Sequence, residues 1–321
     1  MALPTVTDVY DARRRLRGRI APTPLLRSSW LSAIGDGDVH LKIESLNLTN
    51  SFKIRGALNA ALRLGERSDN GGPILVAASA GNHGRALALA AEGLGMPCVI
   101  FTPKTAPEAK QAAIRRHGAT LHADCEDYDE AEKRAKAFAA RAGATYVSPY
   151  NDRDVIAGAG TIGIEIVEAL PAVHVIVVPL GGGGLASGIG LAVKAAAPKA
   201  TIVGVEVEAS SPFSRSLEAG RITEITPRAS LADGLVGNLE PGSMTFPLVR
   251  QLVDRVVTIT EDELARAMQG LAAEERLIVE GAGAAAAAAI VAGKASGSGQ
   301  TVVAMVTGGN VDLPKWLSAI S

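Results

Sequence analysis

Short β-branched runs alternate with apolar, helix-periodic stretches along most of this 321-residue chain. Residues 74–77 precede a polar loop and a helical stretch, and residues 173–179 lead through four glycines into another. Strands that alternate with helices predict mostly parallel sheets with helices on both faces. Open sheets of this kind bind ligands beyond the carboxyl ends of their strands. We therefore expect a two-lobed α/β fold whose site lies at the loops that follow the strands.

Composition argues against several classes of partner. The 32 basic and 33 acidic residues leave a net charge of −1, without the positive patch that nucleic-acid backbones require. Two cysteines with no C-x-x-C spacing indicate neither a disulfide framework nor a redox motif. The N-terminus lacks a signal-peptide pattern, and the longest low-polarity stretch, residues 281–293, falls short of the ~20 residues that span a bilayer. We expect a cytoplasmic protein that binds neither nucleic acid nor membrane.

Four consecutive glycines, residues 181–184, stand between an expected strand and an expected helix. Without side chains, successive backbone N–H groups can converge on one anion, and the helix adds its positive N-terminal dipole end. Four glycines in an ordered turn are conformationally costly, which argues against a merely flexible turn. A Walker loop is excluded because no Gly-Lys-Ser/Thr follows. A Rossmann dinucleotide site, with Gly183, Gly188 and Glu206 in supporting positions, stays open on this motif alone.

Three further motifs are ambiguous when each is taken alone. Lys53 would be a surface residue at a helix start, although cationic and apolar neighbours lower an amine pKa, as a Schiff-base lysine requires. The loop of residues 79–84 opens a helix whose N–H groups suit a carboxylate, but a plain helix cap explains it equally well. The Thr-Gly-Gly-Asn sequence at residues 307–310 would be only a turn.

Taken together, these motifs resemble fold-type II pyridoxal-phosphate (PLP) enzymes of the threonine/serine dehydratase and serine racemase branch. Ser-Phe-Lys at 51–53, Ser-Ala-Gly-Asn-His at 79–83, the four glycines and the Thr-Gly-Gly-Asn occur in the order and spacing of that family. Further matches at residues 19–25, 156–161 and 280–283 extend the resemblance over nearly the whole chain, and the Rossmann alternative falls. The resemblance implies an α/β fold like that of tryptophan synthase β, with two open, twisted, mostly parallel sheets flanked by helices.

The resemblance also implies a role for each matched residue. Lys53 would hold PLP as a Schiff base and later remove the α-proton of a small amino-acid substrate. Phe52 would lie against the cofactor ring, and Asn82 would bond its 3′-oxygen. Thr307 would face the pyridine nitrogen, and Glu280 would line the ring's surroundings. The remaining cofactor contacts would come from Gly181, Gly182, Gly183, Gly184 and Leu185, and the substrate carboxylate would be held by Ser79, Ala80, Gly81, Asn82 and His83.

Two positions favour elimination. The hydroxyl of Thr307, unlike a carboxylate, brings no charge to stabilise a protonated ring nitrogen, so the ring is a weaker electron sink and transamination is disfavoured. A carbanion with a β-leaving group would instead expel that group. Racemases of this branch carry a serine where Ala80 stands, and alanine cannot exchange a proton. We therefore expect conversion of L-threonine or L-serine to a 2-keto acid and ammonia.

Other interpretations stay open from the sequence. The substrate could be another β-hydroxy-amino acid, such as hydroxyaspartate or a hydroxyectoine breakdown product, and residues 233–241 are expected near the site, where they would tune this choice. A non-catalytic PLP-binding protein is disfavoured because Lys53 is intact, and β-replacement with a thiol is disfavoured by Ala80 and its neighbours. Many relatives bind a divalent cation through a Glu and an Asp six residues later; here Glu206 matches but Pro212 takes the second place, so no metal site is expected. The resemblance further implies a homo-oligomer with a large domain of residues 1–49 and 150–321 and a small domain of residues 50–149.

Overall fold

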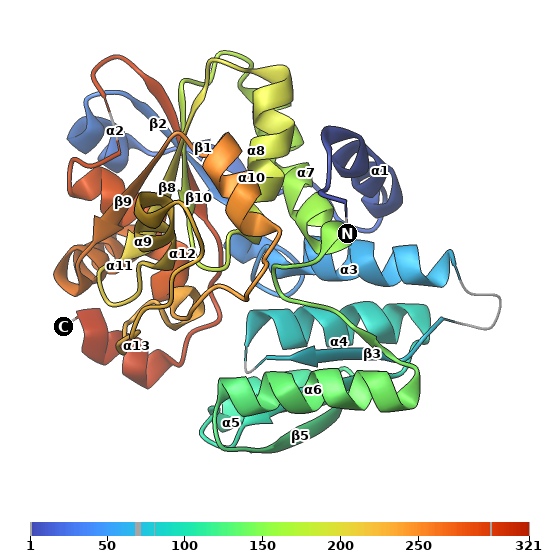
Figure 1. The fold of residues 1–321 in the computed structure, drawn as a ribbon. Coiled ribbons are helices and arrows are strands. Elements are labelled where there is room, and N and C mark those ends of the chain that lie inside the picture. The colour runs from blue at the N-terminus through green and yellow to red at the C-terminus, as the bar shows by residue number, and fades with distance from the viewer. Residues whose placement is uncertain (1, 68–71, 80, 296, 321) are drawn as a thin grey trace.

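The computed structural model describes residues 2–67, 72–79, 81–295 and 297–320, which fold around two separate sheets (Figure 1). The larger sheet has the strand order β1 (Leu25–Arg27), β2 (Asp38–Ile43), β10 (Thr301–Val306), β7 (Val175–Pro179), β8 (Thr201–Val207) and β9 (Arg255–Ile259). The smaller has the order β5 (Thr120–Cys125), β4 (Cys98–Pro103), β3 (Leu75–Ala78) and β6 (Thr145–Tyr146). β1 is antiparallel to β2, and the remaining pairs are parallel. The expected fold class is confirmed.

Helices cover both faces of each sheet. In the larger sheet, α7 and α8 lie on one side and α11 and α12 on the other, whereas in the smaller sheet α3 and α4 lie on one side and α6 on the other (Figure 1). The α-helices are α1 (Val6–Leu16), α2 (Ser29–Gly35), α3 (Lys53–Gly65), α4 (Asn82–Leu94), α5 (Glu108–Arg115), α6 (Tyr128–Ala142), α7 (Arg153–Ala169), α8 (Gly184–Ala196), α9 (Pro212–Ala219), α10 (Thr245–Leu252), α11 (Glu261–Glu275), α12 (Gly281–Val291) and α13 (Leu313–Ile320). Two short 3₁₀ helices are η1 (Glu44–Leu46) and η2 (Asp233–Leu235).

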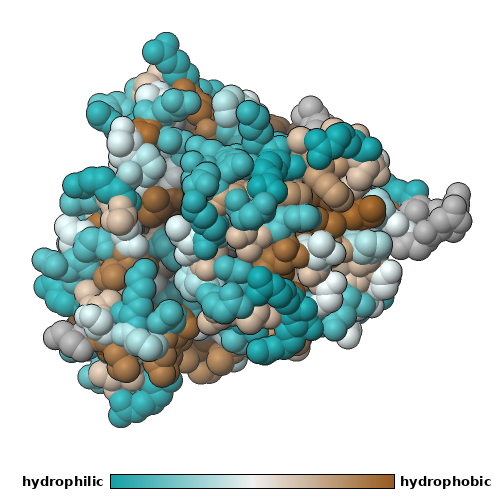
Figure 2. Space-filling model, turned by 90° about the horizontal axis from the view of Figure 1, so that it is seen from below, coloured by the Kyte–Doolittle hydropathy of each residue, from teal (hydrophilic) through white to brown (hydrophobic). Residues whose placement is uncertain are grey.

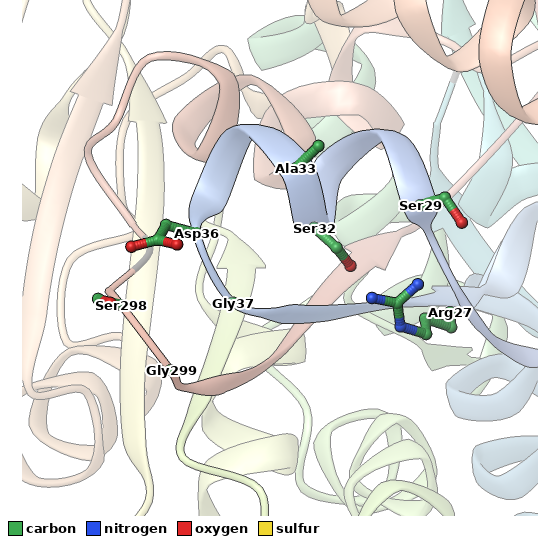
Figure 3. Close-up of a pocket in the computed structure, with 8 residues that line it drawn as sticks. All are labelled: Arg27, Ser29, Ser32, Ala33, Asp36, Gly37, Ser298 and Gly299. Atoms are coloured by element: carbon green, nitrogen blue, oxygen red, sulfur yellow. The ribbon is translucent and has the colours of Figure 1, made fainter.

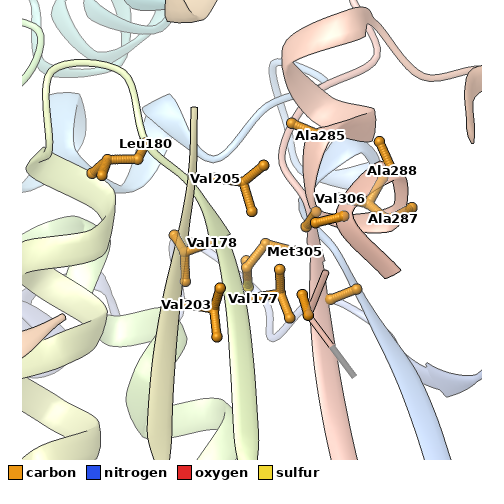
Figure 4. Packing of buried hydrophobic residues seen from close by; sticks show 14 of the residues in the cluster. Val177, Val178, Leu180, Val203, Val205, Ala285, Ala287, Ala288, Met305 and Val306 are labelled. Carbon is orange, nitrogen blue, oxygen red and sulfur yellow. The ribbon is translucent and has the colours of Figure 1, made fainter. Parts of the chain in front are cut away.

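The main core is built from aliphatic side chains, as the low aromatic content of 3% requires. Figure 4 shows Val177 and Val203 on neighbouring strands, with Ala285 and Ala288 of α12 close by. Every residue of α12 from Gly281 to Ile290 is buried. Small side chains let this helix approach the strands closely, and the tight packing fixes the strand ends that carry the loops of the site.

No helix among the described residues combines the length and apolar character needed to cross a bilayer. Seen from below the view of Figure 1, hydrophobic residues are interspersed with hydrophilic ones on the surface (Figure 2).

Candidate active site

The glycine turn follows β7 and runs into α8, which begins at Gly184. Gly183 has a φ of +86°, in the left-handed region that glycine adopts without strain. A Cβ on Gly182 would lie 2.3 Å from Cγ of Tyr150, and a Cβ on Gly183 would lie 2.6 Å from Cζ of Phe213. Packing therefore excludes side chains here. The turn presents backbone N–H groups at a helix N-terminus, an arrangement that suits a phosphate.

Lys53 is the first residue of α3, as the sequence predicts, and the preceding segment ties it to the larger sheet. The backbone N–H of Phe52 donates to the carbonyl oxygen of Thr307 at 3.0 Å, directly after β10. The Nζ atom of Lys53 donates to the carbonyl oxygen of Pro149 at 2.8 Å and lies 5.0 Å from the centre of the Phe52 ring. Lys53 therefore belongs to α3, which flanks the smaller sheet, yet lies at the carboxyl end of β10 in the larger sheet.

Comparison with Lys42 shows what distinguishes the Lys53 amine. Burial lowers the pKa of Lys42 as well, but its Nζ lies 2.5 Å from a carboxylate oxygen of Glu165, which opposes that effect by stabilising the positive charge. No ion pair in the described ranges includes Lys53. Burial lowers the pKa of Lys53 to about 8, against the opposing effect of the Glu280 carboxylate. At pH 7 roughly one Lys53 amine in ten is then unprotonated, and an unprotonated amine can act as a nucleophile or a base.

Side chains from three loops meet near Lys53. Nδ2 of Asn82 donates to Oε1 of Glu280 at 2.6 Å, and Nδ2 of Asn310 donates to Oδ1 of Asn82 at 2.7 Å. Thr307, which is buried, donates from Oγ1 to the carbonyl oxygen of Ala282 at 3.3 Å. Burial raises the pKa of Glu280 to about 7. The structure thus brings Asn82, Glu280 and Thr307 together from segments that are distant in the sequence.

The loop before α4 is held by its own polar groups. The backbone N–H of Gly81 donates to Oγ of Ser79 at 3.2 Å. His83 is buried, and its Nε2 lies 2.9 Å from the carbonyl oxygen of Val147, so Nε2 carries the hydrogen. Burial lowers the pKa of His83 to about 3, helped by the charge of Lys53, and the imidazole stays neutral. Ala80 lies outside the described residues.

Comparison with known proteins matches residues 16–308 to the family described as pyridoxal-phosphate dependent enzyme. The chain belongs to that family. It is 41% identical over 309 residues to the L-threonine ammonia-lyase of Thermotoga maritima, covering 96% of this chain and 76% of the relative. The structure of maize serine racemase superposes with a TM-score of 0.91 at 30% identity, covering 99% of this chain and 97% of the racemase. A threonine deaminase from T.th. gives a TM-score of 0.87 at 36% identity, covering 96% and 99%.

The residues present fit PLP. Tyr150 and Phe213 leave no room for a Cβ on Gly182 or Gly183. The turn is therefore bare backbone, whose N–H groups can hold a phosphate. Lys53 supplies an amine of lowered pKa for the aldehyde, and Asn82 has a second Nδ2 hydrogen beyond the one given to Glu280. Leu185 is buried in the main core, so only its backbone can face a ligand of this PLP-dependent enzyme.

Tyr150 and Phe213 shape the glycine turn, and sequence reasoning missed both. The Tyr150 ring packs against Gly182, and its hydroxyl accepts a hydrogen bond from the backbone N–H of Glu240 at 3.0 Å. Glu240 belongs to the long connection that the sequence places near the site, and Gly234 of the same connection approaches Gly181, where a Cβ would lie 3.2 Å from the Gly234 carbonyl oxygen. No local motif marks either aromatic residue, because each acts through a partner distant in sequence.

Glu206 of β8 has a structural partner inside the protein. Its carboxylate accepts hydrogen bonds from the backbone N–H of Phe213 at 2.7 Å, from the backbone N–H of Ser214 at 2.9 Å and from Oγ of Ser214 at 2.5 Å. Pro212, which stands where many members of the branch have an acid, is the first residue of α9. Glu206 thus anchors the N-terminus of α9 and, through Phe213, supports the glycine turn.

A pocket on the larger lobe lies away from these loops. Its lining includes the polar residues Arg27, Ser32 and Asp36 (Figure 3). Gly37 and Gly299 of its lining precede β2 and β10, so the pocket opens at the amino ends of these strands. Sheets of this type bind ligands at the opposite ends, where the glycine turn and Lys53 lie.

Proposed function

We propose that this PLP-dependent enzyme is a threonine/serine ammonia-lyase, which converts L-threonine or L-serine to a 2-keto acid and ammonia. The observation that carries the proposal is the environment of the Lys53 amine. Burial lowers its pKa to about 8, and it donates to the Pro149 carbonyl oxygen rather than to a carboxylate. Such an amine can both attack an aldehyde and remove a proton at neutral pH. The printed names of the Thermotoga maritima and T.th. relatives support the same reaction.

PLP, when bound, withdraws electrons from the α-carbon of the substrate. Lys53 would take the α-proton on Nζ, with the Pro149 carbonyl oxygen orienting the amine. The electron pair of the broken C–H bond forms the Cα–Cβ double bond, and the β-hydroxyl leaves as water with the proton that Lys53 took, which returns the lysine to its amine form. Water then hydrolyses the released enamine. Threonine therefore gives 2-oxobutyrate and ammonia, and serine gives pyruvate and ammonia.

The remaining residues would bind and orient. Backbone N–H groups from Gly181 to Leu185 would hold the phosphate, and Phe52 would lie against the ring. Asn82 would donate to the ring oxygen, Thr307 would face the ring nitrogen, and Glu280 would stand beside both Asn82 and the ring. The N–H groups at the start of α4, with the residues of the loop 79–83, would hold the substrate carboxylate.

Elimination is proposed over racemisation because of residue 80. Alanine has no hydroxyl with which to return a proton to the opposite face of the α-carbon, so a one-base site built on Lys53 is left. Because the structure is similar to that of maize serine racemase, an assay must measure D-serine as well as the keto acid.

We also propose that the two sheets belong to two domains, a small one of residues 50–149 and a large one of residues 1–49 and 150–321. Two contacts support a site between these domains. Lys53, at the start of a helix of the small domain, donates to Pro149 at the edge of that domain. Asn82, at the start of another such helix, donates to Glu280 of the large domain. A cytoplasmic location is proposed from the two cysteines, which form no disulfide framework, and a homo-oligomer is proposed from the family resemblance.

The proposal is tested by supplying the purified holoenzyme with L-threonine, L-serine and hydroxyaspartate and measuring keto acid and D-amino acid. We expect 2-oxobutyrate from threonine and pyruvate from serine, with no D-serine. Lys53→Ala should lose keto-acid formation. Formation of D-serine without pyruvate would overturn the proposal in favour of racemisation, and keto acid from hydroxyaspartate alone would overturn the substrate assignment.

A further inference from the structure

Arg85, one turn into α4, is a half-buried cation without an acidic partner. No ion pair in the described parts of the chain includes it, and its Nε atom is buried without a hydrogen-bond acceptor. Burial and the nearby charge of Arg116 lower its pKa. Placing a charge in this way is costly unless a hydrogen-bond network compensates it. The only partner found for its side chain within the described residues is an amide: NH1 donates to Oδ1 of Asn310 at 2.6 Å.

That contact fixes the direction of the amide groups that follow. A guanidinium only donates, so the oxygen of Asn310 must face Arg85 and its NH₂ must face the other way. Nδ2 of Asn310 donates to the carbonyl oxygen of Thr49 at 2.8 Å and to Oδ1 of Asn82 at 2.7 Å. The oxygen of Asn82 is thereby occupied, and its NH₂ donates to Oε1 of Glu280 at 2.6 Å. Donors therefore point one way along the relay Arg85–Asn310–Asn82–Glu280.

While Glu280 is ionised, reversing either amide would set two donors or two acceptors against each other at both of its ends. Such a mismatch in a buried site is more costly than the hydrogen bond itself is stabilising. The relay also links a cation to a carboxylate through two polarised amides, and each bond in such a chain strengthens its neighbours. The orientation of the Asn82 amide is therefore held by acceptors at Glu280 and Thr49 and by the donor at Arg85, and Arg85 does this without needing to touch any ligand.

We propose that Arg85 is a positioning residue that holds the amide nitrogen of Asn82 toward the ring oxygen of the cofactor. The proposal rests on the role of Asn82 in the proposed function. Nδ2 has two hydrogens, of which Glu280 takes one. The second is free for the ring oxygen only while the Asn310 amide keeps the oxygen of Asn82 engaged. Without Arg85, the oxygen of Asn310 loses its charged donor and that amide is oriented only through its NH₂, by the Thr49 carbonyl oxygen and Asn82, so the Asn82 nitrogen is held less firmly toward the ring oxygen.

The experiment compares the holoenzyme with its Arg85→Met and Arg85→Lys variants through the visible absorption band of the bound cofactor. In Arg85→Met we expect the pH midpoint of that band to move by about one unit, the size expected for one hydrogen bond. Arg85→Lys keeps a charged donor and should move it by less than half as much. The charged and titratable groups that face Lys53 or the members of the relay from the surrounding elements are Lys53, His83, Lys110, Arg116, Asp233 and Glu280, of which Arg116 acts on Arg85.

Two control variants separate the explanations. Arg116→Met removes an exposed positive charge close to Arg85 without touching the relay, and it should leave the midpoint unchanged. Asn82→Ala removes the donor itself and should move the midpoint at least as far as Arg85→Met. Thermal unfolding of each holoenzyme checks that the variants are folded. If Asn82→Ala shifts the band and Arg85→Met does not, the positioning role is overturned while the proposed function stands. If neither shifts it, the assignment of Asn82 fails and the positioning role fails with it.

Discussion

The phosphate end and the ring end of the site are built by different means. At the phosphate end, bare backbone is held in place by packing, with Tyr150 against Gly182 and Phe213 against Gly183. At the ring end, side chains from α4 and from the loops around β10 and α12 meet through directed hydrogen bonds, with Asn82 between Asn310 and Glu280. The phosphate end depends on the absence of side chains at the glycines, and the ring end depends on which atom of the Asn82 amide donates. Substitutions at the phosphate end should therefore weaken cofactor binding, and substitutions at the ring end should shift the protonation of the groups that meet there.

The largest expected effect lies at the phosphate end, in Gly182→Ala. The new Cβ would overlap the Tyr150 ring, which cannot withdraw without breaking its hydrogen bond with the Glu240 backbone N–H. Overpacking of this kind costs about 1–3 kcal/mol, so we expect the dissociation constant of PLP to rise by about 5- to 150-fold. Titration of the apoprotein with PLP, followed by absorbance, measures it.

Gly93 of α4 offers a matched control for that substitution. A Cβ there would meet nothing within 4 Å, so Gly93→Ala should bind PLP as the unaltered protein does. Adding Tyr150→Ala to Gly182→Ala should recover part of the lost affinity by removing the ring. Unchanged PLP affinity in Gly182→Ala would show that packing does not shape the phosphate end.

A smaller effect is expected from His83→Gln, beside the ring end. The folded protein keeps His83 neutral because its pKa is lowered to about 3, whereas in the unfolded chain it is protonated below its ordinary pKa of 6.5. The unfolded state thus binds an extra proton between pH 6.5 and 3, and stability from this group falls as the pH falls through that window. Between pH 7 and 5 the loss is about 2 kcal/mol.

Glutamine does not titrate, so His83→Gln should lack this part of the pH dependence. Glu280, whose pKa is raised to about 7, binds its proton more readily in the folded state and acts in the opposite direction in both proteins. The difference between the two proteins therefore isolates His83. Urea unfolding at pH 7 and pH 5 gives the two free energies, and equal pH slopes would contradict a neutral buried imidazole.

The smallest effect is expected at a surface ion pair between α5 and η2. Nζ of Lys110 lies 2.8 Å from Oδ2 of Asp233, and both side chains are partly exposed. Exposed ion pairs contribute about 0–1 kcal/mol. Lys110→Met and Asp233→Asn, combined in a double-mutant cycle of unfolding free energies, should give a coupling below about 1 kcal/mol. A larger coupling would mean that this pair, rather than the packing around the glycine turn, holds the connection in place.

Sequence reasoning reached the residues whose signal is local. The four glycines, the lysine at a helix start and the Thr-Gly-Gly-Asn segment each sit in a short motif, and α8 and α3 begin at the glycines and at Lys53, as expected. Tyr150 carries no such signal, because its role depends on Gly182 and Glu240. The direction of the Asn82 amide depends on Asn310, 228 residues away, and an amide's orientation leaves no trace in the sequence.

The central claim is that Lys53, and not another lysine, carries the cofactor, and borohydride reduction of the holoenzyme tests it most directly. Reduction should fix the pyridoxyl group irreversibly, and peptide mass mapping should find it on Lys53. Lys42 is the informative comparison, since it is buried but paired with Glu165. The account predicts a modified Lys53 and an unmodified Lys42. A pyridoxyl group on Lys42 or any other lysine, with Lys53 unmodified, would contradict it.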